Sequence, residues 1–181
     1  MLLSPAVTDI ALSHPGGPAA ALTDPSLAPD SHLLMLLMGH AAAYSNLSLD
    51  DVLTPQGKRI MESVWNTQTV HHINDTAARL FRLDGPILRH PFANFDAWKT
   101  AMTNGSAGRV KPRCPILVCI DTFDGGTVVL VPWQKEYIAA VTALGGDVHS
   151  REYPHADHFR LPFVAGEDAR AWIAQRFADT R

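Results

Sequence analysis

The stretch that decides the fold of this chain is Pro115-Ile-Leu-Val-Cys-Ile120. A continuous apolar run of this length, which begins at a proline and ends at an acidic turn, is typical of a strand covered on both faces, as the strands of parallel sheets are. Downstream, apolar side chains repeat at helical spacing in residues 133–144, and residues 147–153 alternate as a second strand. Residues 166–178 form a closing helix, whose inward face is expected to carry Ala169, Trp172, Ile173 and Phe177. The sequence therefore predicts a parallel strand-helix-strand-helix unit.

Side chains suited to catalysis follow both predicted strands. Asp121 and Asp124 lie in the turn after the first strand, and His158 lies in the loop Tyr153-Pro-His-Ala-Asp-His-Phe159 after the second. The carboxyl ends of parallel strands meet at one edge of a sheet, where active sites form. An imidazole is the usual general base near neutral pH, and a carboxylate orients it. We therefore predict an acid–histidine pair at this edge.

The same residues resemble the last third of an α/β-hydrolase and, within that fold, the secretory lipase family. The likeness lies in an ordered series: the strand at 115–120, Asp124 in a short turn leading to Val131-Pro132, and Arg151-Glu-Tyr-Pro-His-Ala-Asp-His-Phe159. Two looser matches, at residues 49–57 and 104–108, look like that family's segment between the nucleophile half and the acid strand.

The resemblance implies a partial α/β-hydrolase. Residues 1–111 would form a connector and a helical, cap-like region, and residues 112–181 would form the C-terminal parallel β-α-β-α unit. It also implies that Asp124 is the triad acid and His158 the base. Asp121 is the alternative acid, although an aspartate here could also serve only to cap the turn. His155 is the competing histidine, but it occupies a position where the family tends to have a small residue.

A serine nucleophile is expected outside this chain. A nucleophile elbow is Gly-x-Ser-x-Gly between a buried strand and a helix, and the sequence contains no such pentapeptide. The nearest string, Asn104-Gly-Ser106-Ala-Gly108, has Asn in place of the first Gly and follows a predicted helix. In the resembling family the elbow lies upstream of the matched segment, so this chain looks like the C-terminal part of such an enzyme.

The function implied by the resemblance is hydrolysis of carboxylic esters of lipids by a Ser-Asp-His mechanism, with the ester substrate reached through the missing half. Another class of α/β-hydrolase, such as an acyl-peptidase, is an alternative, because one fold hosts many chemistries. A non-catalytic fragment or interaction module is the third interpretation. Whether the chain alone is an enzyme is left open by the missing elbow. No cofactor is expected, and the spacing of His155, Asp157 and His158 fits no standard metal site.

Composition and charge narrow the class of protein. The 181 residues are 46% hydrophobic and 18% charged, which is enough to bury a core. The formal net charge is −3, and Lys and Arg are scattered, so the chain lacks the basic footprint of a nucleic-acid-binding protein. Cys114 and Cys119 are expected to be buried free thiols, because five positions along one strand do not suit a disulfide.

The sequence assigns no cellular location. The first basic residue is Lys58, so the N-terminus lacks the positive region of a signal peptide, although the resembling family is secreted. The apolar run at residues 33–38 is shorter than the ~20 residues that cross a bilayer, so no transmembrane segment is expected.

Short helices are predicted for most of the first 111 residues: a weak helix at 6–12, a helix at 31–44 capped by Ser31 and buried on all sides, a turn at 46–51, and helices beginning at Thr54-Pro55, 67 and 92.

A parallel unit of two strands cannot cover both faces of its own apolar strand. We therefore also expect an unpaired sheet edge beside exposed apolar surface, and self-association through that edge.

Overall fold

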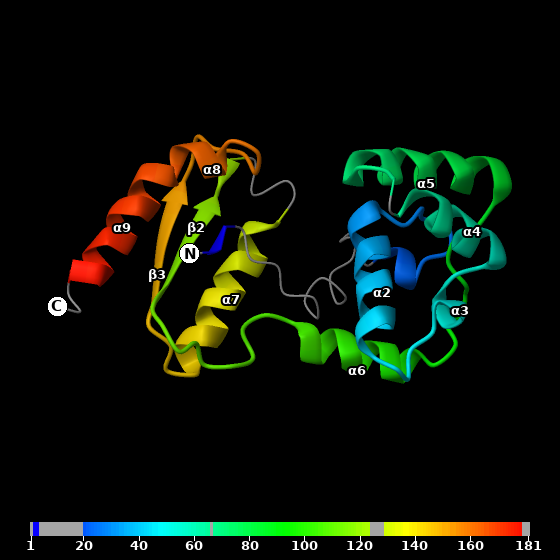
Figure 1. Cartoon of the computed structure of the whole chain (residues 1–181), viewed down its shortest axis with the longest axis horizontal. Helices are drawn as coiled ribbons and strands as arrows, with labels where there is room; N and C mark the ends of the chain where they lie inside the picture. Colours follow the sequence, from blue (N-terminus) through cyan, green and yellow to red (C-terminus); the bar gives the residue numbers. More distant parts are fainter. Residues whose placement is uncertain (1, 4–19, 66, 124–128, 179–181) are drawn as a thin grey trace. The chain divides into compact units, whose positions relative to one another are not determined.

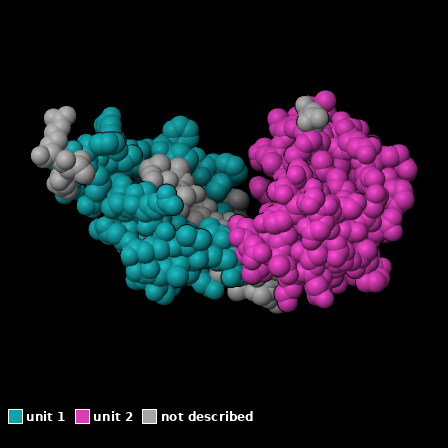
Figure 2. All heavy atoms as spheres, turned by 60° about the horizontal axis from the view of Figure 1, so that its bottom comes forward, with its two compact units in different colours: residues 1–8, 106–181 teal, residues 9–105 magenta. Residues whose placement is uncertain are grey.

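The computed structural model describes residues 2–3, 20–65, 67–123 and 129–178 (Figure 1). The chain divides into two compact units, which Figure 2 shows in different colours. The helical unit is Asp9–Gly105, and the sheet unit combines Met1–Thr8 with Ser106–Arg181. The sequence had suggested one boundary after residue 111, whereas the chain passes between the units at Gly105–Ser106.

The helical unit contains five α-helices in its described part, and their starts follow local capping signals. Thr54 accepts a hydrogen bond from the backbone N–H of Gly57, and Pro55 occupies the first turn, which confirms the predicted start. A 3₁₀ turn, η1 (Ala20–Leu22), precedes the α-helices. The α-helices are α2 (Ser31–Ala43), α3 (Leu49–Val52), α4 (Pro55–Val64), α5 (Val70–Asp84) and α6 (Phe95–Gly105).

Four expectations for this unit need correction or cannot be checked. Asp30, not Ser31, caps α2, because the Asp30 carboxylate accepts from the N–H of Leu33 at 2.8 Å. The helix is also not covered on all sides: Leu34 is buried, but Met35 is 40% exposed. The predicted turn at 46–51 contains the start of α3, which Ser48 caps. The weak helix at 6–12 lies outside the described residues.

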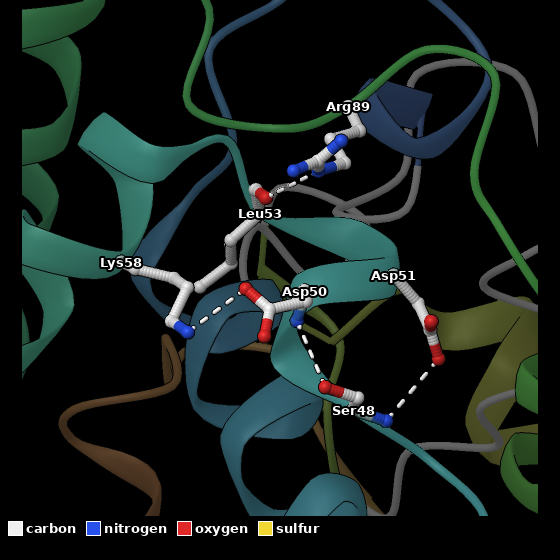
Figure 3. A network of polar contacts seen from close by, with 6 residues as sticks. All are labelled: Ser48, Asp50, Asp51, Leu53, Lys58 and Arg89. Carbon is white, nitrogen blue, oxygen red and sulfur yellow. Dashed lines mark hydrogen bonds and ion pairs between the residues drawn. The ribbon is translucent and has the colours of Figure 1, made fainter.

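Figure 3 shows the polar contacts that hold α3 and its surroundings in place. The Asp51 carboxylate accepts from the N–H of Ser48, which completes a capping box with the Ser48 side chain. The ammonium of Lys58 lies 2.8 Å from Asp50 and lowers the pKa of that carboxyl. Arg89 donates from Nε to the carbonyl of Leu53 at 2.8 Å and so attaches the segment after α5 to the end of α3.

Two glycines in the helical unit provide a matched test of the packing. A methyl group on Gly57 would overlap the carbonyl oxygen of Ile87, which already accepts from Thr54, whereas a methyl on Gly39 would meet nothing within 4 Å. We expect Gly57→Ala to destabilise the protein by about 1–3 kcal/mol through overpacking. Gly39→Ala should stabilise it by about 0.5–1 kcal/mol through helix propensity. Urea unfolding monitored by circular dichroism measures both, and equal effects would contradict the packing at Gly57.

The sheet unit is a small parallel sheet with helices on both faces. Its described strands run in the order β1-β2-β3, with β2 in the middle. In Figure 1, α7 and α9 lie on opposite sides of the β2–β3 pair. The coarse prediction of an α/β fold is therefore correct. The strands are β1 (Leu2–Leu3), β2 (Ile116–Asp121) and β3 (Val148–Tyr153), and the helices are α7 (Val131–Ala143), α8 (Leu161–Val164) and α9 (Gly166–Ala178).

The middle strand β2 is buried on both faces, as its continuous apolar run predicted. Leu117 and Cys119 belong to a cluster that also contains Leu161 of α8, with Trp172 of α9 packed against it. Val118 and Ile120 are equally buried and point to the other face, because successive strand side chains alternate. That face is the one on which α7 packs.

The prediction that the free edge of β2 would be unpaired is wrong in part. Val118 and Cys119 pair with Leu2 and Leu3 of β1, a contact between distant parts of the sequence. Among the described strands, β3 is the edge strand on the other side. It exposes Arg151 and Glu152, the kind of charged residues that disfavour edge-to-edge pairing. Self-association remains a prediction.

Other apolar side chains are more exposed than their periodicity suggested. Ile173 and Phe177 of α9 were expected to face inward, but both are exposed, and Phe163 of α8 is 86% exposed. Both cysteines are free thiols, although Cys114 is exposed and only Cys119 is buried. Of the helices that the structure describes, none is long and apolar enough to cross a membrane.

Candidate active site

The predicted acid–histidine edge forms where β2 and β3 end together. Asp121 is the last residue of β2 and pairs in register with Tyr153, the last residue of β3. The N–H of Thr122 then bonds to the carbonyl of Tyr153 at 3.4 Å. The two strands therefore end side by side: β2 contributes Asp121 to the site, and the loop after β3 contributes His158.

Asp121 is completely buried, and a side chain from α7 binds its carboxylate. Gln134, which is also fully buried, donates from Nε2 to Asp121 Oδ1 at 2.8 Å. The same Nε2 donates to the backbone carbonyl of Val129 at 2.9 Å. A buried carboxylate needs such donors, because removing it from water is otherwise costly. No sequence signal indicated Gln134, because the contact joins two separate elements, α7 and the end of β2.

The loop that presents His158 is fixed by a local hydrogen-bond pattern. The Asp157 side chain accepts from the N–H groups of Phe159 and Arg160 at 3.0 and 2.8 Å, and its carbonyl accepts from Leu161 at 2.9 Å. Asp157 thus starts the turn that leads into α8. Ala156 is buried in the same cluster as Leu161 and anchors the loop on the sheet. Asp157 therefore shapes the loop locally.

His158 and Asp121 face each other across this edge. His158 Nδ1 lies 3.6 Å from Asp121 Oδ2, an ion-pair distance slightly longer than a hydrogen bond. The Nδ1 atom is enclosed, whereas the side chain as a whole is 33% exposed. Catalytic hydrogen bonds are often long before substrate binds. With Nδ1 protonated toward the carboxylate, Nε2 is left to accept a proton, as a general base requires.

The other candidate residues are placed as follows. Asp124, the predicted triad acid, lies outside the described residues, so its prediction is untested. Asp121, the alternative acid, is the carboxylate that the structure places beside His158. The competing His155 is exposed in the same loop. Ser106 is buried and follows helix α6, with irregular chain after it, so its surroundings do not form a nucleophile elbow.

A second polar cluster joins β3 to α9 next to the site. The Tyr153 hydroxyl donates to one oxygen of Asp168 at 2.8 Å, and Arg151 pairs with the other at 2.6 Å. These contacts lower the pKa of Asp168, first through Tyr153 and then through Arg151. Burial, followed by the bond to Asp168, raises the pKa of Tyr153. The cluster holds the end of β3, and therefore the start of the His158 loop, against α9.

Within the part of the chain that the structure describes, no three His, Cys, Asp or Glu side chains gather as metal ligands would. No protein-family model, curated protein or solved structure matches the chain. The geometry of Asp121 and His158 is therefore the structural feature of the described chain that bears most directly on function.

Proposed function

We propose that this chain supplies the acid–histidine part of a Ser-Asp-His hydrolase that cleaves carboxylic esters of lipids. His158 is the general base, Asp121 is the acid that orients it, and the serine comes from another polypeptide segment. One observation carries the proposal. The fully buried carboxylate of Asp121, at the end of β2, lies 3.6 Å from the partly exposed imidazole of His158, on the loop after β3. Acid and histidine follow the chain order of α/β-hydrolases.

The chemistry follows from the surroundings of each group. Asp121 has no exposed surface, and its negative charge is held near Nδ1, where it stabilises the imidazolium that forms when His158 takes the serine proton. His158 then returns that proton to the leaving alcohol. The ester class comes from the resemblance to secretory lipases, because the geometry of the pair alone is common to several acyl-transfer reactions.

The proposal predicts that the purified chain alone does not turn over p-nitrophenyl butyrate above the rate of a His158→Gln variant. Without a nucleophile and an oxyanion hole, the acyl intermediate neither forms nor is stabilised. Co-expression with a segment that contains Gly-x-Ser-x-Gly, sought in the coding sequence upstream of Met1, should produce turnover that His158→Gln reduces by about 10⁴-fold.

Two results would contradict this assignment. Hydrolysis by the chain alone that is lost in Ser106→Ala would make the Asn104–Gly108 loop the active site. Turnover by the assembled protein that survives His158→Gln would remove His158 from the mechanism.

A further inference from the structure

Gln134 is a fully buried polar side chain for which the catalytic proposal gives no role. Its amide NH₂ group has two N–H bonds, and both are used: one donates to Asp121 Oδ1 at 2.8 Å and the other to the Val129 carbonyl at 2.9 Å. Because these bonds point in fixed directions from one planar group, the amide cannot turn without losing both. The backbone of Val129 thus holds the donor that faces Asp121.

This contact constrains which way the carboxylate faces. The last torsion of an aspartate side chain is broad, so a carboxylate without a fixed donor can rotate. Gln134 holds Oδ1, and Oδ2 is then the oxygen that faces His158 Nδ1. The donor is also neutral, so it leaves the negative charge of Asp121 available to His158. A lysine or arginine in its place would compete with the imidazolium for that charge.

A second observation favours a role beyond packing. The other amide atom of Gln134, Oε1, is buried and has no hydrogen-bond donor within the described structure. A buried acceptor without a partner costs about 1–3 kcal/mol. An apolar side chain of the same length would fill the space without that cost. The amide is therefore explained by what its NH₂ group does at Asp121 and Val129.

We infer that Gln134 is a positioning residue: it fixes the Asp121 carboxylate so that His158 holds its proton on Nδ1 and presents Nε2 for catalysis. The inference rests on the proposed function, because it assigns Gln134 a role through the Asp121–His158 pair. Gln134 itself contacts neither the imidazole nor a reacting atom in this assignment.

The test is the tautomer of His158 in the full chain, read from its imidazole ¹⁵N shifts at a pH where the ring is neutral. Wild type is expected to favour the Nδ1–H form. Gln134→Met keeps a side chain of similar length and removes both N–H donors. It should lower the ratio of the Nδ1–H to the Nε2–H tautomer of His158 by about three- to tenfold, a change equivalent to the loss of one hydrogen bond. Val141→Ala is the matched control, because Val141 is buried on the same helix and its side chain is apolar. It should leave the ratio unchanged.

The outcomes separate the two proposals. A wild-type ratio in folded Gln134→Met overturns the role of Gln134 and leaves the Asp121–His158 pair intact. If wild type shows no preference for Nδ1–H and Asp121→Asn changes nothing, the pair itself fails. If Gln134→Met does not fold, the side-chain amide protons of wild-type Gln134 decide. Both should exchange slowly with solvent, and exchange as fast as in a free glutamine overturns the inference.

Discussion

Trp98→Ala is expected to lower the free energy of unfolding of the helical unit by about 3–5 kcal/mol, the range for emptying the site of a large buried aromatic. Trp98 is 1% exposed and belongs to the main apolar cluster of this unit, together with Leu37 and Met61. Its indole N–H also donates to Asp51 Oδ2 at 3.1 Å. That oxygen keeps its bond from the N–H of Ser48, so most of the loss should come from the cavity.

Urea titration followed by far-ultraviolet circular dichroism measures this loss, because most of the helix lies in this unit. Trp98→Phe keeps much of the volume and loses the hydrogen bond, so it should cost about 1–2 kcal/mol. Phe163→Ala removes an aromatic ring that is almost fully exposed, and it should change stability by less than about 0.5 kcal/mol. Equal losses for Trp98→Ala and Phe163→Ala would show that Trp98 is not at the centre of a core.

The parts of the fold that could be predicted are those with a local signal. The apolar run at β2 and the Thr54-Pro55 start of α4 each depend on a few consecutive residues. The cap of α2 was missed because Asp30 and Ser31 are both good capping residues. The choice depends on a distant contact, since the backbone N–H of Ser31 bonds to Asn74 of α5. Strand β1 has only two residues and no periodicity, so its pairing with β2 could not be predicted.

The difference between local sequence signals and long-range packing also applies to the exposed surface of the helices. The spacing of Ile173 and Phe177 predicted that both side chains of α9 face inward, but both are exposed, because spacing does not say whether anything covers that face. Elsewhere on α9, Ala169 is buried and Trp172 packs against the cluster that contains Leu117 and Cys119. Periodicity thus predicts which side chains share a face, and the width of the neighbouring layer decides how many of them are buried.

At the site, the sequence placed Asp121 and His158 after neighbouring parallel strands, and the structure brings them together at one edge of the sheet. The predicted strand ended at Ile120, whereas β2 includes Asp121. This difference of one residue matters, because Asp121 as part of β2 is held in register with Tyr153 and is buried. The pattern of the resembling family favoured Asp124 instead. Two carboxylates three positions apart cannot be ranked by sequence alone, so the choice needs a direct experiment.

A matched pair of variants makes that choice. Asp121→Asn should lower the kcat of the assembled hydrolase by about 10³–10⁴-fold, because an amide in this position can donate to Nδ1 and stabilise the wrong tautomer of His158. Asp124→Asn introduces the same chemical change three residues away and should lower kcat by less than about tenfold if Asp121 is the acid. Initial rates on a short-chain ester, together with the ¹⁵N tautomer signals of His158 in the chain alone, measure both effects.

The change in kcat and the change in the His158 tautomer must agree, because both depend on which carboxylate faces Nδ1 of His158. Asp121 is fully buried and hydrogen-bonded by Gln134, so in Asp121→Asn the remaining oxygen accepts from Gln134 only when the new NH₂ group faces His158. In the opposite orientation two NH₂ groups face each other, and the variant loses stability. Thermal unfolding of Asp121→Asn separates this effect, since a folded variant with an altered tautomer has lost orientation rather than structure. If Asp124→Asn instead removes both turnover and the Nδ1–H form, Asp124 is the acid. The buried Asp121–Gln134 contact then serves to hold the end of β2 against α7.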